Sequence, residues 1–186
     1  MSVLAIDTSS RSRVVAVVAT RGGGLLESEV IRGEQVVASL PRVLGRMLGA
    51  VDSAVVVVTG PGTYTGVRAG MAAALGVAHA SHLPLHGLGT LEVVACGDPD
   101  AGAADWVIAD AGRGALYVAR AGDAANPSRV RQSDFDSAGA RVLSTDRIEI
   151  AGLVVLDPAL ALARAIPLAL SRPALDRAGL SALYVD

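Results

Sequence analysis

Short apolar runs dominate the start of the chain. They occur at Val3–Ile6, Val14–Ala19 and Leu25–Ile31, and the glycine turn Gly22–Gly24 separates the last two. Apolar runs of this length that are joined by tight turns are typical of an antiparallel meander. The pattern therefore predicts three consecutive paired strands.

The next segment changes to helical periodicity. An apolar stripe follows Gly33, and Pro41 falls inside it, so that the helix should kink there or a new segment should begin. The stripe consists of Val36, Val37, Leu40, Leu44, Met47 and Leu48.

A further strand and two further helices are expected after this stripe. Val55–Val58 is an unbroken valine run, as expected of a strand that is buried on both faces. Gly66–Ala80 predicts a helix. Thr90 is the expected N-cap of another helix, which continues through Cys96.

The opening pattern recurs from Val107. In both places an apolar strand ends on an aspartate, first Asp7 and then Asp110, and a turn of polar or small residues leads into a second apolar strand. The recurrence favours a duplicated unit. Two unrelated hairpins would produce the same pattern, so this alternative stays open.

The pattern weakens toward the C-terminus. We expect a surface loop or irregular hairpin over Gly122–Gly139 and a strand pair within Arg141–Ile150. Gly152–Leu156 predicts another apolar strand, and Pro158–Ile166 a helix with proline at its start. Gly179–Val185 would add a last strand.

The order of these elements defines an expected fold. Three strands followed by helix, strand and helix is the order of the ribonuclease-H-like unit, which actins, sugar kinases and heat-shock chaperones share. We therefore expect an α/β protein of the actin-like ATPase (ribonuclease-H-like) fold with two tandem units, residues 1–100 and 101–186. The second unit is shorter, so its lobe should be reduced.

The amino-acid composition excludes several kinds of active site. Hydrophobic residues make up 52% of the 186 residues and aromatic ones only 3%, which indicates a core of small side chains. All 16 basic residues are arginines, so Schiff-base and P-loop lysines are excluded. The net charge is −2 and the arginines are scattered along the chain. A protein that binds nucleic acid by itself usually has a clustered basic surface, which this sequence does not indicate.

The same composition bears on the compartment. Cys96 is the only cysteine, which fits a reducing compartment and a buried small hydrophobe rather than a nucleophile. The N-terminus lacks the basic region of a signal peptide, and no uncharged apolar run approaches the roughly 18–20 residues of a membrane span. We expect a soluble, cytoplasmic protein without a membrane partner.

The segment Gly60–Gly66 invites a nucleotide motif. It joins a strand to a helix, which is the layout of a phosphate-binding turn. No lysine follows its last glycine, and its third glycine comes one residue too late for the dinucleotide motif. Either the turn lets the backbone approach something closely, with Thr63 or Thr65 capping the helix, or it is a plain connection.

Asp7 is the other candidate. In actin-like nucleotide enzymes an aspartate in this place precedes a glycine turn and holds metal and phosphates, whereas here Thr8 and Ser9 follow it. Asp7 is therefore expected either to bind a cation or to cap a turn. Arg68 is suited either to an anion near the glycine turn or to an acid such as Glu34. The candidate nucleotide or anion contacts are Asp7, Thr8, Ser9, Gly62, Thr63 and Arg68.

The three histidines do not have the spacing of a metal site. His79 and His82 can share a helix face, but Pro84 places His86 on another element, and no carboxylate lies between them in a metalloprotease spacing. Exposed histidines at helix ends are the better interpretation. With no nucleophile elbow and no marked acid pair, we predict neither catalytic residues nor a metal site, and a metallopeptidase lacks the ligands it needs.

The helix Gly66–Ala80 is apolar on every side. A helix that covers one face of a sheet needs only one apolar stripe, so this helix should be covered twice. The second cover is another protein, a second copy of the chain or, alternatively, the second lobe. Gly66 and Gly70, like Ala69 and Ala73, are four residues apart, a spacing that would let a partner's backbone come close.

Four segments together resemble the TsaB (YeaZ) family, once labelled a glycoprotease. They are Ala5–Ser9, Gly60–Gly70, Pro84–Leu91 and Ala109–Tyr117, of which Gly60–Gly70 is the most specific. The resemblance covers the chain from Val3 to about Arg120. After Arg120 the chain is shorter than is usual for the family, and residues 126–139 match no known segment.

The resemblance implies a role in tRNA modification. TsaB belongs to the machinery that places threonylcarbamoyl on the adenosine beside the anticodon, where it pairs with the catalytic subunit TsaD and the ATPase TsaE joins them. Members of the family can also form homodimers through the surface that pairs with TsaD. The chain itself would bind no cofactor, ATP and a metal would be used by the partner complex, and tRNA would be met only through that complex.

The same resemblance places the partner surface on two helices. They are 34–48 and Gly66–Ala80, and the expected interface residues are Val36, Val37, Leu40, Leu44, Val67, Gly70, Met71, Ala73 and Ala74. The alternative function is a nucleotide-binding or ATP-hydrolysing enzyme of the actin-like fold, which would depend on Asp7.

Overall fold

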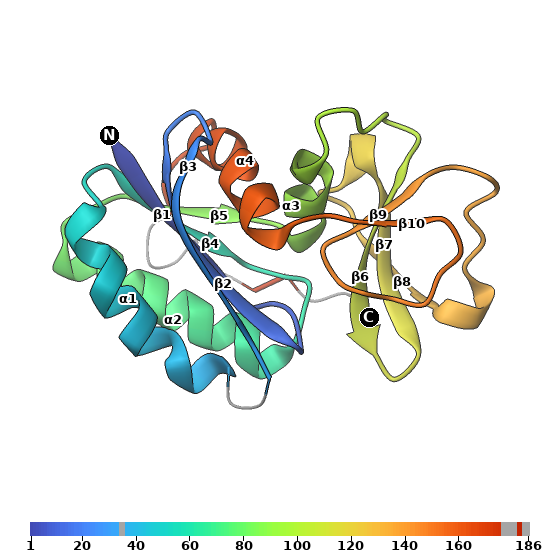
Figure 1. Cartoon of the computed structure of the whole chain (residues 1–186), viewed down its shortest axis with the longest axis horizontal. Coiled ribbons are helices and arrows are strands. Elements are labelled where there is room, and N and C mark those ends of the chain that lie inside the picture. The colour runs from blue at the N-terminus through green and yellow to red at the C-terminus, as the bar shows by residue number, and fades with distance from the viewer. Residues whose placement is uncertain (34–35, 176–181, 184–186) are drawn as a thin grey trace.

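Two five-stranded sheets with the same strand order form the frame of the molecule (Figure 1). The computed structural model describes residues 1–33, 36–175 and 182–183, with the side chains of Val36 and Val37 left undescribed. Of the tail strand predicted over residues 179–185, only Ala182 and Leu183 fall within the described residues, and neither belongs to a strand.

The first sheet contains the predicted meander. Its strands are β1 (Ser2–Asp7), β2 (Arg13–Thr20), β3 (Leu25–Arg32), β4 (Ala54–Val58) and β5 (Leu85–Leu88). The order is β3-β2-β1-β4-β5, in which β2 pairs antiparallel with β1 and β3, and β4 pairs parallel with β1 and β5. Every residue of β4 is buried, which confirms the prediction from the valine run.

The second sheet repeats this plan. Its strands are β6 (Trp106–Gly112), β7 (Ala115–Arg120), β8 (Ser128–Arg131), β9 (Val142–Ser144) and β10 (Leu153–Val155). In the order β10-β9-β6-β7-β8 each strand has the neighbours of its counterpart in the first sheet, with the same parallel and antiparallel pairings. The duplication suggested by Asp7 and Asp110 is therefore confirmed, and the alternative of two unrelated hairpins is wrong.

Four α-helices lie within the described residues. They are α1 (Leu40–Met47), α2 (Tyr64–Ala80), α3 (Thr90–Gly97) and α4 (Pro158–Leu170). Pro41 lies in the first turn of α1 and follows a short 3₁₀ helix, Val36–Ser39, so it begins a new segment as expected. Further 3₁₀ turns occur at Leu48–Ala50, Ala121–Asp123 and Gln132–Asp134.

Helices cover both faces of the first sheet. Leu4 and Ile6 pack toward α1 and α2 on one face, whereas Val3 and Ala5, which alternate with them, pack against α4 on the other. Figure 1 shows α1 and α2 on one side of the first sheet and α4 on the other. This alternation explains why β1 is apolar at every position before Asp7 except Ser2.

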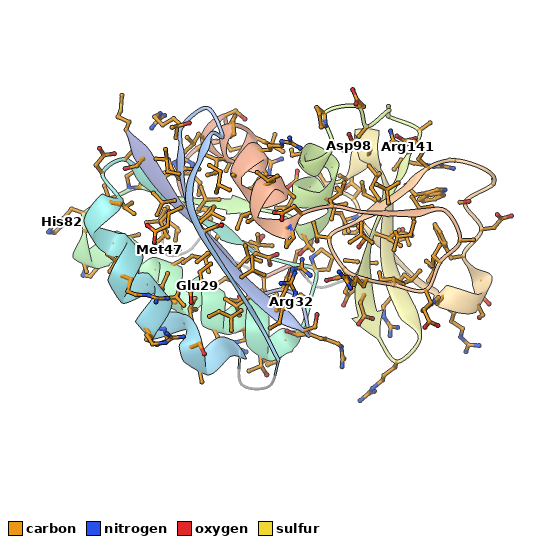
Figure 2. All side chains as sticks on the ribbon, viewed as in Figure 1. Glu29, Arg32, Met47, His82, Asp98 and Arg141 are labelled. Carbon is orange, nitrogen blue, oxygen red and sulfur yellow. The ribbon has the colours of Figure 1, made fainter. Side chains whose placement is uncertain are left out.

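One helix of each repeat packs on the sheet of the other repeat. In sequence α3 follows the first sheet, yet its Leu91 and Val94 pack on the second, while α4 follows the second sheet and packs on the first. At the end of α3, Asp98 pairs with Arg141 just before β9 (Figure 2). The division at residue 100 stays a prediction, since α3 and α4 pack across it.

The second lobe is reduced because its outer face has no α-helices among the described residues. Ile108 and Leu116 on that face are covered instead by Phe135 and Ile148 from irregular segments. The expectation of a smaller second lobe is therefore confirmed, and its physical form is a sheet with helical cover on one side only.

The segment Gly122–Gly139, predicted as a surface loop or an irregular hairpin, contains the exposed strand β8, which pairs antiparallel with β7 and so favours the hairpin. Two other local predictions need correction. Residues 141–150 hold one strand, β9, rather than a pair. Gly89, not Thr90, is the N-cap of α3.

None of the helices in the described residues has both the length and the apolar character that crossing a membrane requires.

Candidate functional site

The turn after β1 lies against the start of α2. The Thr8 hydroxyl donates a hydrogen bond to the Gly66 carbonyl oxygen (2.7 Å), and the Thr63 amide donates one to the Ser9 carbonyl oxygen (2.9 Å). Gly66 and Gly70 come so close to Thr8 that a Cβ at either position would overlap its atoms. The two glycines therefore serve packing inside the chain, which corrects the prediction that their spacing admits a partner's backbone.

The glycine turn before α2 is also in contact with the chain itself. A Cβ on Gly62 would lie 2.6 Å from the Ser9 carbonyl oxygen. Thr90 donates its hydroxyl to the Pro61 carbonyl oxygen (2.7 Å) and its amide to that of Gly60 (2.8 Å). The backbone of this glycine turn was expected to approach something closely. It approaches the turn after β1 and the start of α3.

Thr63 and Arg68 are the remaining candidate anion contacts, and they lie on α2 and at its start. Thr63 is the N-cap residue of α2, as expected, but its side chain makes no capping hydrogen bond. Arg68 lies on the exposed side of α2, where its guanidinium is 5.0 Å from the centroid of the Tyr64 ring and donates to the Tyr64 hydroxyl. Its other expected partner, Glu34, lies outside the described residues.

A buried arginine joins the two repeats. Arg13, the first residue of β2, is 4% exposed, and its guanidinium pairs with Asp146 of the second repeat and lies 3.7 Å from the Asp7 carboxylate. It also donates to the Thr145 hydroxyl (2.7 Å). Asp7 accepts hydrogen bonds from the Ser9 amide (2.9 Å) and hydroxyl (2.6 Å), so of its two expected roles it takes that of capping the turn.

The second repeat has an equivalent turn at the same place. Asp110 accepts a hydrogen bond from the Gly112 amide (2.6 Å), as Asp7 does from Ser9. The Asp110 amide donates to one carboxylate oxygen of Asp146 (3.3 Å), and the Ser10 hydroxyl donates to the other (3.1 Å). The turns of both repeats therefore meet at Asp146.

A cleft of about 1030 Å³ opens beside this cluster. Figure 2 shows Arg32 at the end of β3, on the side of the first sheet that faces the second. Charged groups of both signs line the cleft, namely Arg13, Arg32, Arg147, Asp110, Asp146, Glu149 and Asp157. The lining is therefore not a basic surface for a polyanion.

An actin-like fold implies a nucleotide and its metal in this cleft, but the residues present do not fit them. Asp7, expected to hold the cation, is engaged by Ser9 and faces the Arg13 guanidinium, which would repel a metal ion. Thr8, in the place of the flexible glycine, is bonded to Gly66. Within the described part of the chain, no three His, Cys, Asp or Glu side chains are arranged to hold a metal.

The outer side of α2 is not covered by any part of the chain that the structure describes. Ala72, Gly76 and His79 are exposed along it, and none of the described residues outside the helix has an atom within 4 Å of the place a Gly76 Cβ would occupy. Figure 1 shows α1 and α2 on the opposite side of the first sheet from α4, with the second lobe leaving them uncovered. The alternative that the second lobe buries α2 is therefore wrong.

Most residues expected at a partner interface face the core instead. Leu40, Leu44, Val67, Met71 and Ala74 are buried between the helices and the first sheet, Gly70 is buried against Thr8, and Ala73 is half-buried. The side chains of Val36 and Val37 lie outside the description. A partner that binds these helices must contact outer residues such as Ala72 and Gly76 on α2, Gly45 on α1, or Gly49 in the 3₁₀ turn after α1.

A second polar cluster lies where α3 meets the chain after α4. The Glu92 carboxylate accepts hydrogen bonds from the Gly89 amide (2.7 Å) and the Arg172 guanidinium (3.0 Å). Burial alone would raise the pKa of Glu92, but these partners outweigh it and lower that pKa. Nearby His86 is buried, unlike exposed His79, so the expectation of exposed histidines is wrong for His86.

Sequence reasoning missed Arg13, Thr145 and Asp146. Arg13 carried one usable signal, a charge at the first position of a strand that is otherwise apolar up to Thr20. Asp146 carried none, because it follows a three-residue strand in a region without periodicity.

The duplicated sheets and the cleft between them define a protein of the actin-like ATPase fold. The family model "TsaD: tRNA N6-adenosine threonylcarbamoyltransferase" matches residues 48–167. The chain therefore belongs to this family. The fold resembles that of YeaZ from Pseudomonas aeruginosa, with a TM-score of 0.68 and 21% identity over 99% of both chains.

Curated relatives are longer than this chain. An uncharacterized protein of Mycobacterium leprae is 32% identical over 84% of this chain and 46% of its own length. An uncharacterized protein of Mycobacterium tuberculosis is 33% identical over 64% of this chain and 58% of its own length. The chain thus spans about half the length of these relatives.

Proposed function

We propose that the chain is a non-catalytic partner subunit in the synthesis of threonylcarbamoyladenosine on tRNA. It binds and supports a TsaD-like catalytic subunit, a TsaE-like ATPase joins them, and tRNA is met only through the complex. Membership of the TsaD family and the YeaZ-like fold support the pathway. The cleft, whose aspartates are engaged by Ser9 and Arg13, supports a role outside catalysis.

The uncovered outer side of α2 carries the proposal. Small side chains at Ala72 and Gly76 leave a flat surface on which another helix can pack closely. In the isolated chain this surface of small side chains is exposed to water. The ATP and metal of the reaction are then used by the partner complex, in which this chain supplies a docking surface.

Gly76→Arg tests the docking surface with little risk to the fold, because none of the described residues outside the helix has an atom within 4 Å of the position of its Cβ. We expect the affinity for the TsaD-like subunit of the same cell to fall at least tenfold, measured by calorimetry on purified subunits. Ala151→Arg, on an exposed turn of the second lobe, is the matched control and should bind like the wild type.

The outcomes separate the alternatives. Unchanged binding by Gly76→Arg would overturn the α2 surface, and no binding by the wild type would overturn the partner role itself. Light scattering of the wild type alone tests the homodimer, which the same substitution should dissociate if it uses α2. The rival function, a self-sufficient nucleotide enzyme, requires saturable ATP binding that weakens in Asp7→Ala.

A further inference from the structure

We propose that the Arg13 guanidinium takes the place of a bound cation and locks the two lobes together, so that the cation position beside the cleft is filled by the chain itself. The proposal is independent of the partner role. It starts from the mismatch between the cleft residues and the nucleotide and metal that the fold implies.

The lock has partners in both repeats. From β2 of the first repeat, Arg13 pairs with Asp146 and donates to Thr145, both of which follow β9 in the second repeat. On its own side it faces Asp7 at 3.7 Å. One guanidinium therefore neutralises charge contributed by each lobe, which is the task a metal ion performs between two carboxylates.

Burial makes this connection strong. The side chains of Arg13, Asp7 and Asp146 are 4%, 6% and 11% exposed, so water screens their interaction little. Removing one member leaves an uncompensated buried charge, which is far more costly than losing a surface ion pair. The Arg13 Nε is buried without a hydrogen-bond partner in the described residues, so its position is set by what the two Nη atoms bind.

Asp146 extends the lock beyond a single pair. It accepts hydrogen bonds from the Ser10 hydroxyl and the Asp110 amide, so the turns of both repeats are held by one carboxylate. A magnesium nucleotide entering here would have to displace Arg13 and leave it without its acidic partners. The lock therefore excludes this ligand while keeping the lobes in a fixed relation.

Hydrogen exchange measured by mass spectrometry on the full chain tests the proposal. In Arg13→Gln we expect backbone exchange to rise at least tenfold in 7–13 and 144–147, while exchange in β4 stays unchanged. Arg13→Lys, which keeps a charge, should show a smaller rise. Arg32→Gln is the matched control, because Arg32 lines the same cleft but is exposed.

A second variant protects the test against a folding defect. Asp146→Asn removes the charge from the second-lobe side only and should open the same two segments. Calorimetry with ATP and Mg²⁺ should show no binding by the wild type. Unchanged exchange in both variants, an equal rise in β4, or saturable binding of magnesium ATP by the wild type would each overturn the lock.

Discussion

The Thr8 hydroxyl donates a hydrogen bond to the Gly66 carbonyl oxygen at 2.7 Å, which ties the end of β1 to the first turn of α2. The glycine-rich segment that resembles a phosphate turn is thus used to bring a helix against a strand end. Two glycines of α2 consequently have opposite surroundings, since Gly70 lies against Thr8 and Gly76 faces outward.

This contrast predicts opposite effects of the same substitution. Gly70→Ala should lower the free energy of unfolding by about 1–3 kcal/mol, because its methyl group overlaps Thr8. Gly76→Ala should raise it by about 0.5–1 kcal/mol, because alanine is the better helix former and the site is open. Urea unfolding of the isolated chain measures both.

A double substitution checks the cause. In a Thr8→Ala background the Thr8 hydroxyl and methyl groups that a Gly70 Cβ would meet are gone and only the Cβ of residue 8 remains, so Gly70→Ala should cost less than in the wild type. Equal costs in the two backgrounds would show that Thr8 does not set the need for glycine.

The first lobe was predictable because its elements are local. Runs such as Val55–Val58 and the duplicated Asp7 and Asp110 turns follow from patterns within a few residues. The cleft was not, because Arg13 and Asp146 are 133 positions apart and only the fold brings them together. The same limit applies to α2, whose apolar composition did not reveal which glycines face Thr8.

His86 predicts a pH dependence of stability. Burial lowers the pKa of His86, with Arg21 adding to this, while the nearby backbone of Arg172 and Ala169 opposes it. Because the folded value lies below the ordinary 6.5, the unfolded chain binds the proton more readily. The stability that depends on neutral His86 is therefore fully present above that pH and is lost as pH falls through the folded pKa.

The measurement is urea unfolding from pH 7.5 down to pH 5. His86→Gln cannot titrate, so its stability should fall less over this range than that of the wild type. His79→Gln, at an exposed position on α2, is the control and should follow the wild type. Parallel curves for His86→Gln and the wild type would remove His86 as the cause.

The pair of Glu92 and Arg172 predicts a second, more acidic transition. Arg172→Ala leaves the buried Glu92 carboxylate with the Gly89 amide alone and should cost about 1–2 kcal/mol, moderated by the partial exposure of Arg172. Since the pKa of Glu92 is held below 4.5, this stability is present above that pH and is lost as pH falls through the folded pKa. A smaller cost of Arg172→Ala in a Glu92→Gln background, by urea unfolding, would confirm the coupling, and additive costs would contradict it.

Cys96 should react slowly although it is the only thiol. Burial raises the pKa of Cys96 and the negative charge of Glu92 raises it further, so little thiolate, the reactive form, is present at pH 8. We expect modification by a disulfide reagent to be at least tenfold slower in the folded chain than in urea. Glu92→Gln should speed the folded reaction, because it removes the charge that opposes the thiolate. Cys96 is partly buried against the cluster that contains α4. A native rate equal to that of the unfolded chain would contradict this, because it would show that Cys96 is accessible and has an ordinary pKa.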